Sequence, residues 1–129
     1  MANKTQSKKT KTIISGGKGK IYVSTTFNNT IVTITNEKGD TIAWGTSGSV
    51  GFKGTRKSTP YAATQAADQA IKKARENGLQ NVEVYIKGPG VGRDAALRSI
   101  RSSGLLISMI ADVTPIPHNG PRPKKKRRI

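Results

Sequence analysis

Hydrophobic and polar residues alternate with a period of two in three short stretches near the start of the chain. Residues 20–27, 30–35 and 41–44 are rich in β-branched and aromatic side chains, and this combination is typical of β-strands. Turn-forming residues at 28–29 and 37–40 separate the three stretches. Because the connections are short, we expect an antiparallel meander.

The next part of the chain has the pattern of a helix. Alanines recur at helical spacing between residues 63 and 74. Ser58 or Thr59 can cap this helix, Pro60 suits its first turn, and Gly78 follows its end. Because the apolar stripe is mostly alanine, the helix is expected to lie close against a sheet.

The last part of the chain repeats the strand and helix patterns once each and adds a final strand. Residues 82–87 alternate again, and the glycine-rich segment 88–92 leads into a second helix from Arg93 to about Ser103. The near-continuous apolar run at 105–113 is expected to be a strand covered on both faces. The order β-β-β-α-β-α-β predicts an α/β (mixed α+β) single domain, with a mixed five-stranded sheet and right-handed crossovers.

Positive charge is concentrated at the two ends of the chain. Among 129 residues there are 23 Lys and Arg against 7 Asp and Glu, a net charge of +16. Residues 1–20 and residues 115–129 hold six cations each and no acid. We therefore expect a basic flexible arm at 1–19, a core at 20–114 and a Pro-rich basic tail at 115–129. Basic N- and C-terminal extensions on a nearly neutral core are typical of proteins that bind polyanions.

Composition argues against several other classes of protein. The chain has no cysteine and one histidine, His118, so a disulfide framework, a zinc site and a catalytic triad are not expected. Residues 1–11 lack the apolar segment of a secretory signal, and the longest apolar run is too short to cross a bilayer. The seven acids do not converge as a two-metal nuclease requires. We therefore expect no catalytic activity, no metal and no cofactor.

Two glycine-rich basic loops are the strongest candidates for contact with RNA. At 88–93, alternating glycines would let the backbone approach a phosphate at a helix N-terminus, and Arg93 would add donors. A tight strand-to-helix turn with a surface arginine explains the same pattern equally well. At 51–57, three cations could contact phosphates. Phe52 in this loop either stacks on a base or, in the reading we favour, is buried in the core.

The remaining candidates lie on the second helix and in the tail. Arg98 and Arg101 share one helix face, and prolines stiffen the tail into an extended form. His118 would either stack on a base or face solvent. The full set of predicted RNA-binding residues comprises cations, loop glycines and polar tail residues: Lys18, Lys53, Arg56, Lys57, Gly88, Gly90, Gly92, Arg93, Arg98, Arg101, His118, Asn119, Arg122, Lys124, Lys125, Lys126, Arg127 and Arg128.

Asn119 is followed by Gly120, a pair that is prone to isoaspartate formation. Glycine offers little steric hindrance, so its backbone nitrogen can attack the asparagine side chain. We predict this conversion as a hypothesis, and peptide mapping that finds only ordinary asparagine in native material would exclude it.

Several segments, in order along the chain, resemble the family of the eleventh protein of the small ribosomal subunit. They are residues 27–35, residues 54–60 with Ala62 and Ala63, residues 87–90 and 112–120, and the basic tail at 122–128. Together they span most of the chain, and the form resembles the bacterial or organellar type. Pro121, Lys124 and Val91 depart from the family pattern, and so does the absence of a histidine from the first strand. These departures bear on the path of the tail after residue 120.

The resemblance implies a specific biological setting. It implies a ribonuclease-H-like sheet without the nuclease acids, and a structural role in a ribonucleoprotein that binds small-subunit rRNA on the platform. It implies the seventh and eighteenth small-subunit proteins as neighbours, and the messenger exit path, where the Shine–Dalgarno helix forms, close by.

The sequence as a whole thus predicts a cytoplasmic ribosomal protein that acts in translation and is not an enzyme. The alternative is a general nucleic-acid-binding protein of the nucleoid type, which would show no preference for a folded RNA. A metal-dependent nuclease is the third reading, and a magnesium-dependent cleavage assay would reveal it.

Overall fold

In the computed structural model the described residues are 15–129, so most of the predicted arm at 1–19 lies outside them. The described elements follow the predicted order β-β-β-α-β-α-β, which is confirmed. Their bounds are β1 Lys18–Thr25, β2 Thr30–Asn36, β3 Thr41–Thr46, α1 Pro60–Glu76, β4 Asn81–Lys87, α2 Gly92–Ser102 and β5 Leu106–Asp112, with short 3-10 turns η1 at Ser15–Gly17 and η2 at Gly54–Ser58.

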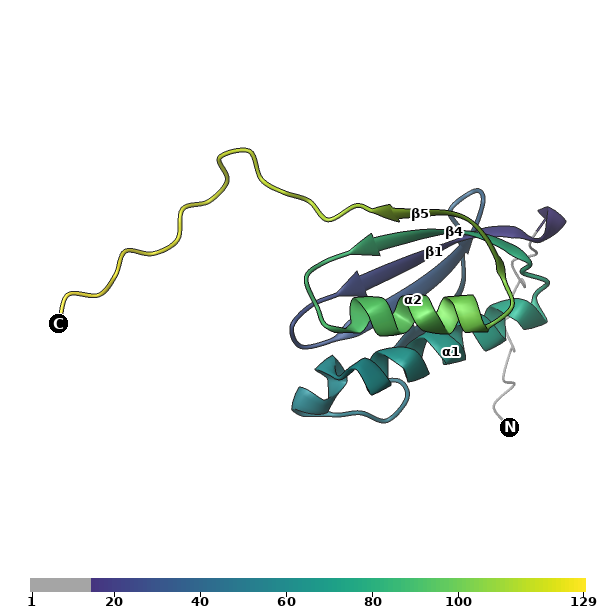
Figure 1. The fold of residues 1–129 in the computed structure, drawn as a ribbon, viewed down its shortest axis with the longest axis horizontal. Helices are drawn as coiled ribbons and strands as arrows, with labels where there is room; N and C mark the ends of the chain where they lie inside the picture. Colours follow the sequence, from purple (N-terminus) through teal and green to yellow (C-terminus); the bar gives the residue numbers. More distant parts are fainter. Residues whose placement is uncertain (1–14) are drawn as a thin grey trace, which may run out of the picture.

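The five strands form one mixed sheet in the order β3-β2-β1-β4-β5. β1 is antiparallel to β2 and parallel to β4, and β4 is parallel to β5. Both helices lie on the same face of this sheet (Figure 1), where α1 packs on β2 and β3 and on α2. The predicted single domain with a mixed five-stranded sheet is therefore confirmed.

The alanine stripe of α1 explains how this helix approaches the sheet so closely. Seven residues along α1 are buried, and six of them are alanines. Opposite them in β3, a Cβ added to Gly45 would clash with the carbonyl oxygen of Ala66. Thr59 caps the helix, because its side-chain oxygen accepts a hydrogen bond from the Ala62 N–H at 3.2 Å.

The prediction that the last strand is covered on both faces is wrong. β5 is at the edge of the sheet and pairs with β4 on one side within residues 15–129. Leu106 is 69% exposed and Met109 is 42% exposed, whereas Ile107 packs against the core. Both helices lie on one face of the sheet and pack mainly on β2 and β3, so the other face, which includes Leu106, is open within the described residues. An apolar run in the sequence does not show which faces of its strand the helices will cover.

The aromatic residues also differ from expectation. Phe52 is half-buried and outside the core, and its ring packs edge-to-face on Tyr61 at 5.7 Å between centroids. β1 ends at Thr25, which leaves Phe27 73% exposed. Alternation would place Ile42 and Trp44 on one face, but a register shift in the pairing of β2 and β3 leaves Trp44 exposed while Ile42 packs on the core.

No helix within residues 15–129 is both long enough and apolar enough to cross a membrane.

Candidate nucleic-acid interface

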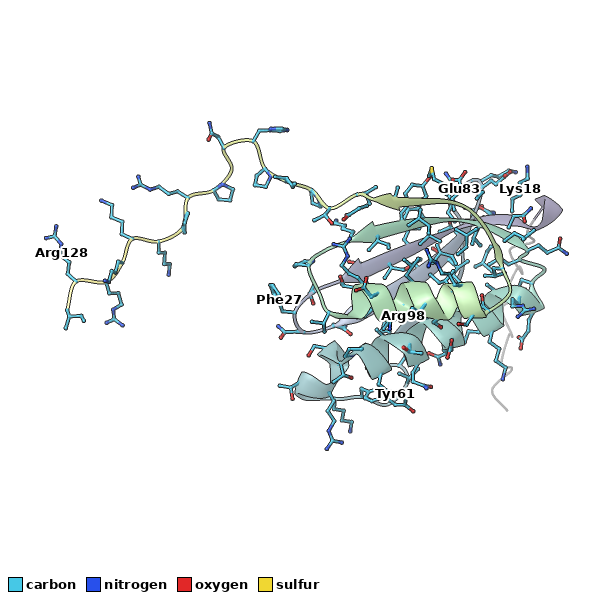
Figure 2. The ribbon with its side chains drawn as sticks, in the orientation of Figure 1. Lys18, Phe27, Tyr61, Glu83, Arg98 and Arg128 are labelled. Atoms are coloured by element: carbon cyan, nitrogen blue, oxygen red, sulfur yellow. The ribbon has the colours of Figure 1, made fainter. Side chains whose placement is uncertain are left out.

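Three described parts of the chain present predicted RNA-binding cations at the surface: the η2 turn before α1, the outer face of α2, and the tail after β5. Figure 2 labels Arg98 on α2 and Arg128 near the end of the tail. A further predicted contact, Lys18, is exposed at the start of β1. Since β1, β4 and β5 run parallel, Lys18 lies at the opposite end of the sheet from the start of the tail. The structure therefore does not bring Lys18 together with the tail.

The turn before α1 holds two exposed cations beside an aromatic ring. Lys53 and Arg56 are exposed and line a shallow hollow together with Phe52, whereas Lys57 is half-buried. The hydroxyl of Ser58 donates to the Thr55 carbonyl at 2.8 Å and holds this turn. The turn thus presents Lys53 and Arg56 directly in front of the N-terminus of α1.

The loop between β4 and α2 uses its glycines for packing inside the protein. The Gly90 N–H donates to the Thr25 hydroxyl at 3.1 Å, and the Gly88 N–H donates to the Thr114 hydroxyl at 3.1 Å. A Cβ added to Gly92 would clash with the Thr30 side chain. Because two of these amides already have acceptors, the geometry favours the reading of this loop as a tight strand-to-helix turn.

Arg93 is likewise engaged within the protein. Its Nη1 donates to the Gly88 carbonyl at 3.1 Å, and its Nη2 lies 2.5 Å from Asp112 Oδ2. The Asp112 carboxylate also accepts from the Thr114 hydroxyl at 2.6 Å and the Thr114 N–H at 3.1 Å. The hydroxyl of Thr114 contributes most, followed by Arg93, to holding the pKa of Asp112 at about 2, below its usual 3.8.

Sequence reasoning did not identify Asp112 or Thr114 as parts of this arrangement. A signal was present, because an aspartate that accepts a hydrogen bond from the N–H two residues later forms a common local turn. The contact with Arg93, 19 residues away, has no comparable signal in the sequence.

The outer face of α2 presents the predicted arginines next to an aromatic residue from α1. Arg98 and Arg101 are exposed, and Arg98 lines a hollow that also includes Tyr61. Figure 2 shows Arg98 and Tyr61 on the two adjacent helices. Tyr61 is 64% exposed, so charge and a ring for stacking are available side by side. Tyr61 is not among the residues predicted from the sequence, although an aromatic residue in the polar first turn of an alanine-rich helix is a usable signal.

The basic tail extends away from the core and is exposed from residue 115 to residue 129 (Figure 1). Asn119 has a φ of 58°, and Gly120 lies so close to Pro117 that an added Cβ would clash. The chain therefore turns at this point, and His118 is exposed at the turn. The six tail cations, Arg122, Lys124, Lys125, Lys126, Arg127 and Arg128, all follow the turn.

Comparison with known protein families shows to which family the chain that carries this basic surface belongs. The family model described as ribosomal protein S11 matches residues 19–128, which include all but the first residue of the sheet, both helices and nearly all of the tail. The chain belongs to the ribosomal protein S11 family.

Membership in the ribosomal protein S11 family gives the coarse function. Proteins of this family are structural components of the small ribosomal subunit and bind its rRNA. Within residues 15–129, no group of three or more His, Cys, Asp or Glu residues is arranged to hold a metal ion. The described surface presents exposed cations, among them Arg98 and Arg101, and exposed aromatic rings such as Tyr61.

Proposed function

We propose that this protein docks on folded rRNA at the platform of the small subunit through its core and anchors itself there with its tail. The observation that carries the proposal is the separation of two kinds of cation. Arg98 and Arg101 are held on a rigid helix, whereas the six tail cations follow a turn outside the core. Rigid cations can match the shape of one folded RNA, and tail cations neutralise any phosphates they reach.

The same proposal includes the setting that the family resemblance implies. The protein helps shape the messenger exit region where the Shine–Dalgarno helix forms, in the cytoplasm, beside the seventh and eighteenth small-subunit proteins. The arm at 1–19, the core at 20–114 and the tail at 115–129 form its three functional parts. Lys53, Arg56 and Lys57 in front of α1 would extend the core contact.

A competition binding assay across a salt series tests this function. The ligand is a folded platform fragment of small-subunit rRNA, and the competitors are duplex DNA and shuffled RNA of equal length. Binding driven by charge weakens steeply with salt for every ligand. We expect the rRNA fragment to keep its advantage as salt rises, because the core recognises shape. A parallel loss for all three ligands would favour the nucleoid-type alternative.

A pair of variants sharpens the same assay. Replacing Arg98 and Arg101 with glutamine should reduce the advantage of the rRNA fragment over shuffled RNA. The control, Lys72→Gln, removes an exposed cation of α1 that is outside the predicted interface and should leave this advantage unchanged. Equal behaviour of the two variants would contradict the role of the α2 surface.

A further inference from the structure

The tail leaves the core at a closed cycle of interactions made by four residues. Asp112 ends β5, Thr114 follows it, and Gly88 and Arg93 lie in and after the loop that precedes α2. We propose that these four residues, here termed the tail clamp, fix the direction in which the basic tail leaves the core, and that the tail depends on the clamp to bind rRNA. Asp112 is then a positioning residue for RNA binding, although its own negative charge repels the RNA phosphates.

The bonds of the tail clamp link three separate parts of the fold. Arg93 bonds to both Gly88 and Asp112, and Thr114 bonds to both Asp112 and Gly88. Each of the four residues therefore contacts two of the others, and the cycle joins the end of β4, the start of α2 and the end of β5. The Val113 N–H also donates to the Ile86 carbonyl at 2.8 Å, which continues the sheet pairing past β5.

The ion pair by itself would not hold the tail. The side chains of Arg93 and Asp112 are 32% and 52% exposed, and exposed ion pairs contribute little to stability. Here, however, two of the interactions involve the N–H and carbonyl of Gly88, which is buried. The tail is thus tied to main-chain groups of the core as well as to a flexible side chain.

The segment after the clamp is stiff enough to transmit this direction. Pro115 and Pro117 restrict the residues before them to extended conformations, and the turn at Asn119 follows. Arg122, the first tail cation, is eight residues beyond Thr114 and is therefore at most about 29 Å away. A loose junction would let the tail sample many directions, and ordering the tail on RNA would then carry a larger entropic penalty.

The charge of Asp112 makes the proposal testable, because simple electrostatics predicts the opposite result. Replacing Asp112 with asparagine removes one acid, so the net charge of +16 rises by one. A protein that bound RNA by charge alone would then bind more tightly. If the clamp directs the tail, Asp112→Asn should bind more weakly. This inference rests on the proposed contact between the tail and rRNA.

The experiment is a double-mutant cycle in the full-length protein, with the folded platform fragment of small-subunit rRNA as the probe. Asp112→Asn is combined with a neutral tail in which the six tail cations are replaced by glutamine. The control is Glu37→Gln, which removes an exposed acid at the turn between β2 and β3 and raises the charge equally. Thermal unfolding of each variant shows that it is folded.

We expect Asp112→Asn to weaken binding roughly three- to tenfold when the tail is native, and Glu37→Gln to weaken it not at all. With the neutral tail, Asp112→Asn should cause no further loss. A loss of equal size with both tails would show that Asp112 only supports the fold, and would overturn the clamp. If Asp112→Asn with the native tail binds as tightly as Glu37→Gln, the proposed role of the clamp is also overturned. If the protein with the neutral tail and native Asp112 binds the rRNA fragment as tightly as the unsubstituted protein, the tail does not contact rRNA. The proposed function of the tail and the role of the clamp are then both wrong.

A second measurement follows the tail without RNA. The chain has one tryptophan, Trp44, and no cysteine, so the substitution Ile129→Cys provides a single site for a dye that accepts energy transfer from Trp44. We expect the distribution of Trp44–dye distances to broaden in Asp112→Asn and to stay unchanged in Glu37→Gln. An unchanged distribution in Asp112→Asn would contradict the clamp.

Discussion

The glycines of the loop between β4 and α2 are required by the atoms that lie against them. Gly88 has a φ of +102°, a backbone conformation that side chains disfavour, and an added Cβ would collide with the Thr25 carbonyl. Gly90 lies against the same part of the chain, since an added Cβ would clash with the Thr26 carbonyl oxygen and the Thr25 side chain. The alternating glycines at 88–92 are a pattern that is compatible with phosphate binding. Close packing inside the protein is sufficient to explain them.

Gly88→Ala should lower the free energy of unfolding by at least about 2 kcal/mol, because it combines backbone strain with a collision against main-chain atoms. Chemical denaturation measures the change. Gly51→Ala is the matched control, since Gly51 has a φ of +97° but open space around its Cβ position, and it should lose about 1 kcal/mol from strain alone. Equal losses would contradict the collision with Thr25.

Asp112 should titrate at an unusually low pH. The Thr114 hydroxyl and Arg93 favour its ionised form and hold its pKa at about 2. Because this folded-state pKa is below the usual 3.8, the clamp's contribution to stability is complete above pH 3.8 and is lost as the pH falls towards 2. NMR titration of the carboxyl carbon should give a midpoint near 2.

A threonine-to-valine substitution then identifies the cause of this low pKa. In Thr114→Val the midpoint should rise towards the usual value, because the largest stabilising hydrogen bond is removed while Arg93 remains. A midpoint near 3.8 in the unsubstituted protein would show that the carboxylate is not held as described.

At the scale of elements, short-range signals in the sequence predicted the position and the ends of the helices well, and they predicted the burial of the strands less completely. α1 begins at Pro60, one residue after its Thr59 cap, and Gly78 follows its end. The alternation in β4 also predicted its buried residues, Val82, Val84 and Ile86. β5 was the exception, since the exposure of Leu106 depends on which face of the sheet the helices cover.

Thr59→Ala should destabilise the protein by about 1 kcal/mol, because the Ala62 N–H would lose its acceptor at the start of α1. Thermal or chemical unfolding of the purified variant measures this. Ser58→Ala is the control at the neighbouring position, and since Ser58 does not cap α1 it should lose about half as much or less. A larger loss for Ser58→Ala would contradict the assignment of the cap.

At the scale of the whole molecule, charge is divided between a folded core and an exposed tail. The six tail cations lie beyond a turn, whereas Arg98 and Arg101 are held on α2 against the core. This division separates non-specific attraction to phosphate from recognition of shape, and the two contributions can be measured independently through their salt dependence.

Neutralising the tail should reduce the dependence of rRNA binding on salt. Each neutralised phosphate contributes roughly 0.7 to 0.9 to the slope of log K against log salt, so six glutamines should reduce that slope by up to about 5. Replacing Arg122, Arg127 and Arg128 with lysine keeps the charge and should leave the slope unchanged. An unchanged slope in the glutamine variant would show that the tail does not contact phosphate.

Residues close together in the chain were sufficient to determine much of this protein. Periodicity, caps and turns gave the order of the elements, and the distribution of lysine and arginine separated the basic ends from the core. These features depend on neighbours within a few residues, whose geometry is set by backbone hydrogen bonding and by the spacing of side chains.

Only the tertiary structure decided which partners the candidate residues have within the protein. Gly90 bonds to Thr25, 65 residues away, and Gly88 bonds to Thr114, 26 residues away, so these two loop amides already have acceptors within the protein. The partner of Arg93 and the exposure of β5 were settled in the same way. Such pairings follow from which strands become neighbours in the sheet, and contacts between distant residues leave no periodic signal in a single sequence.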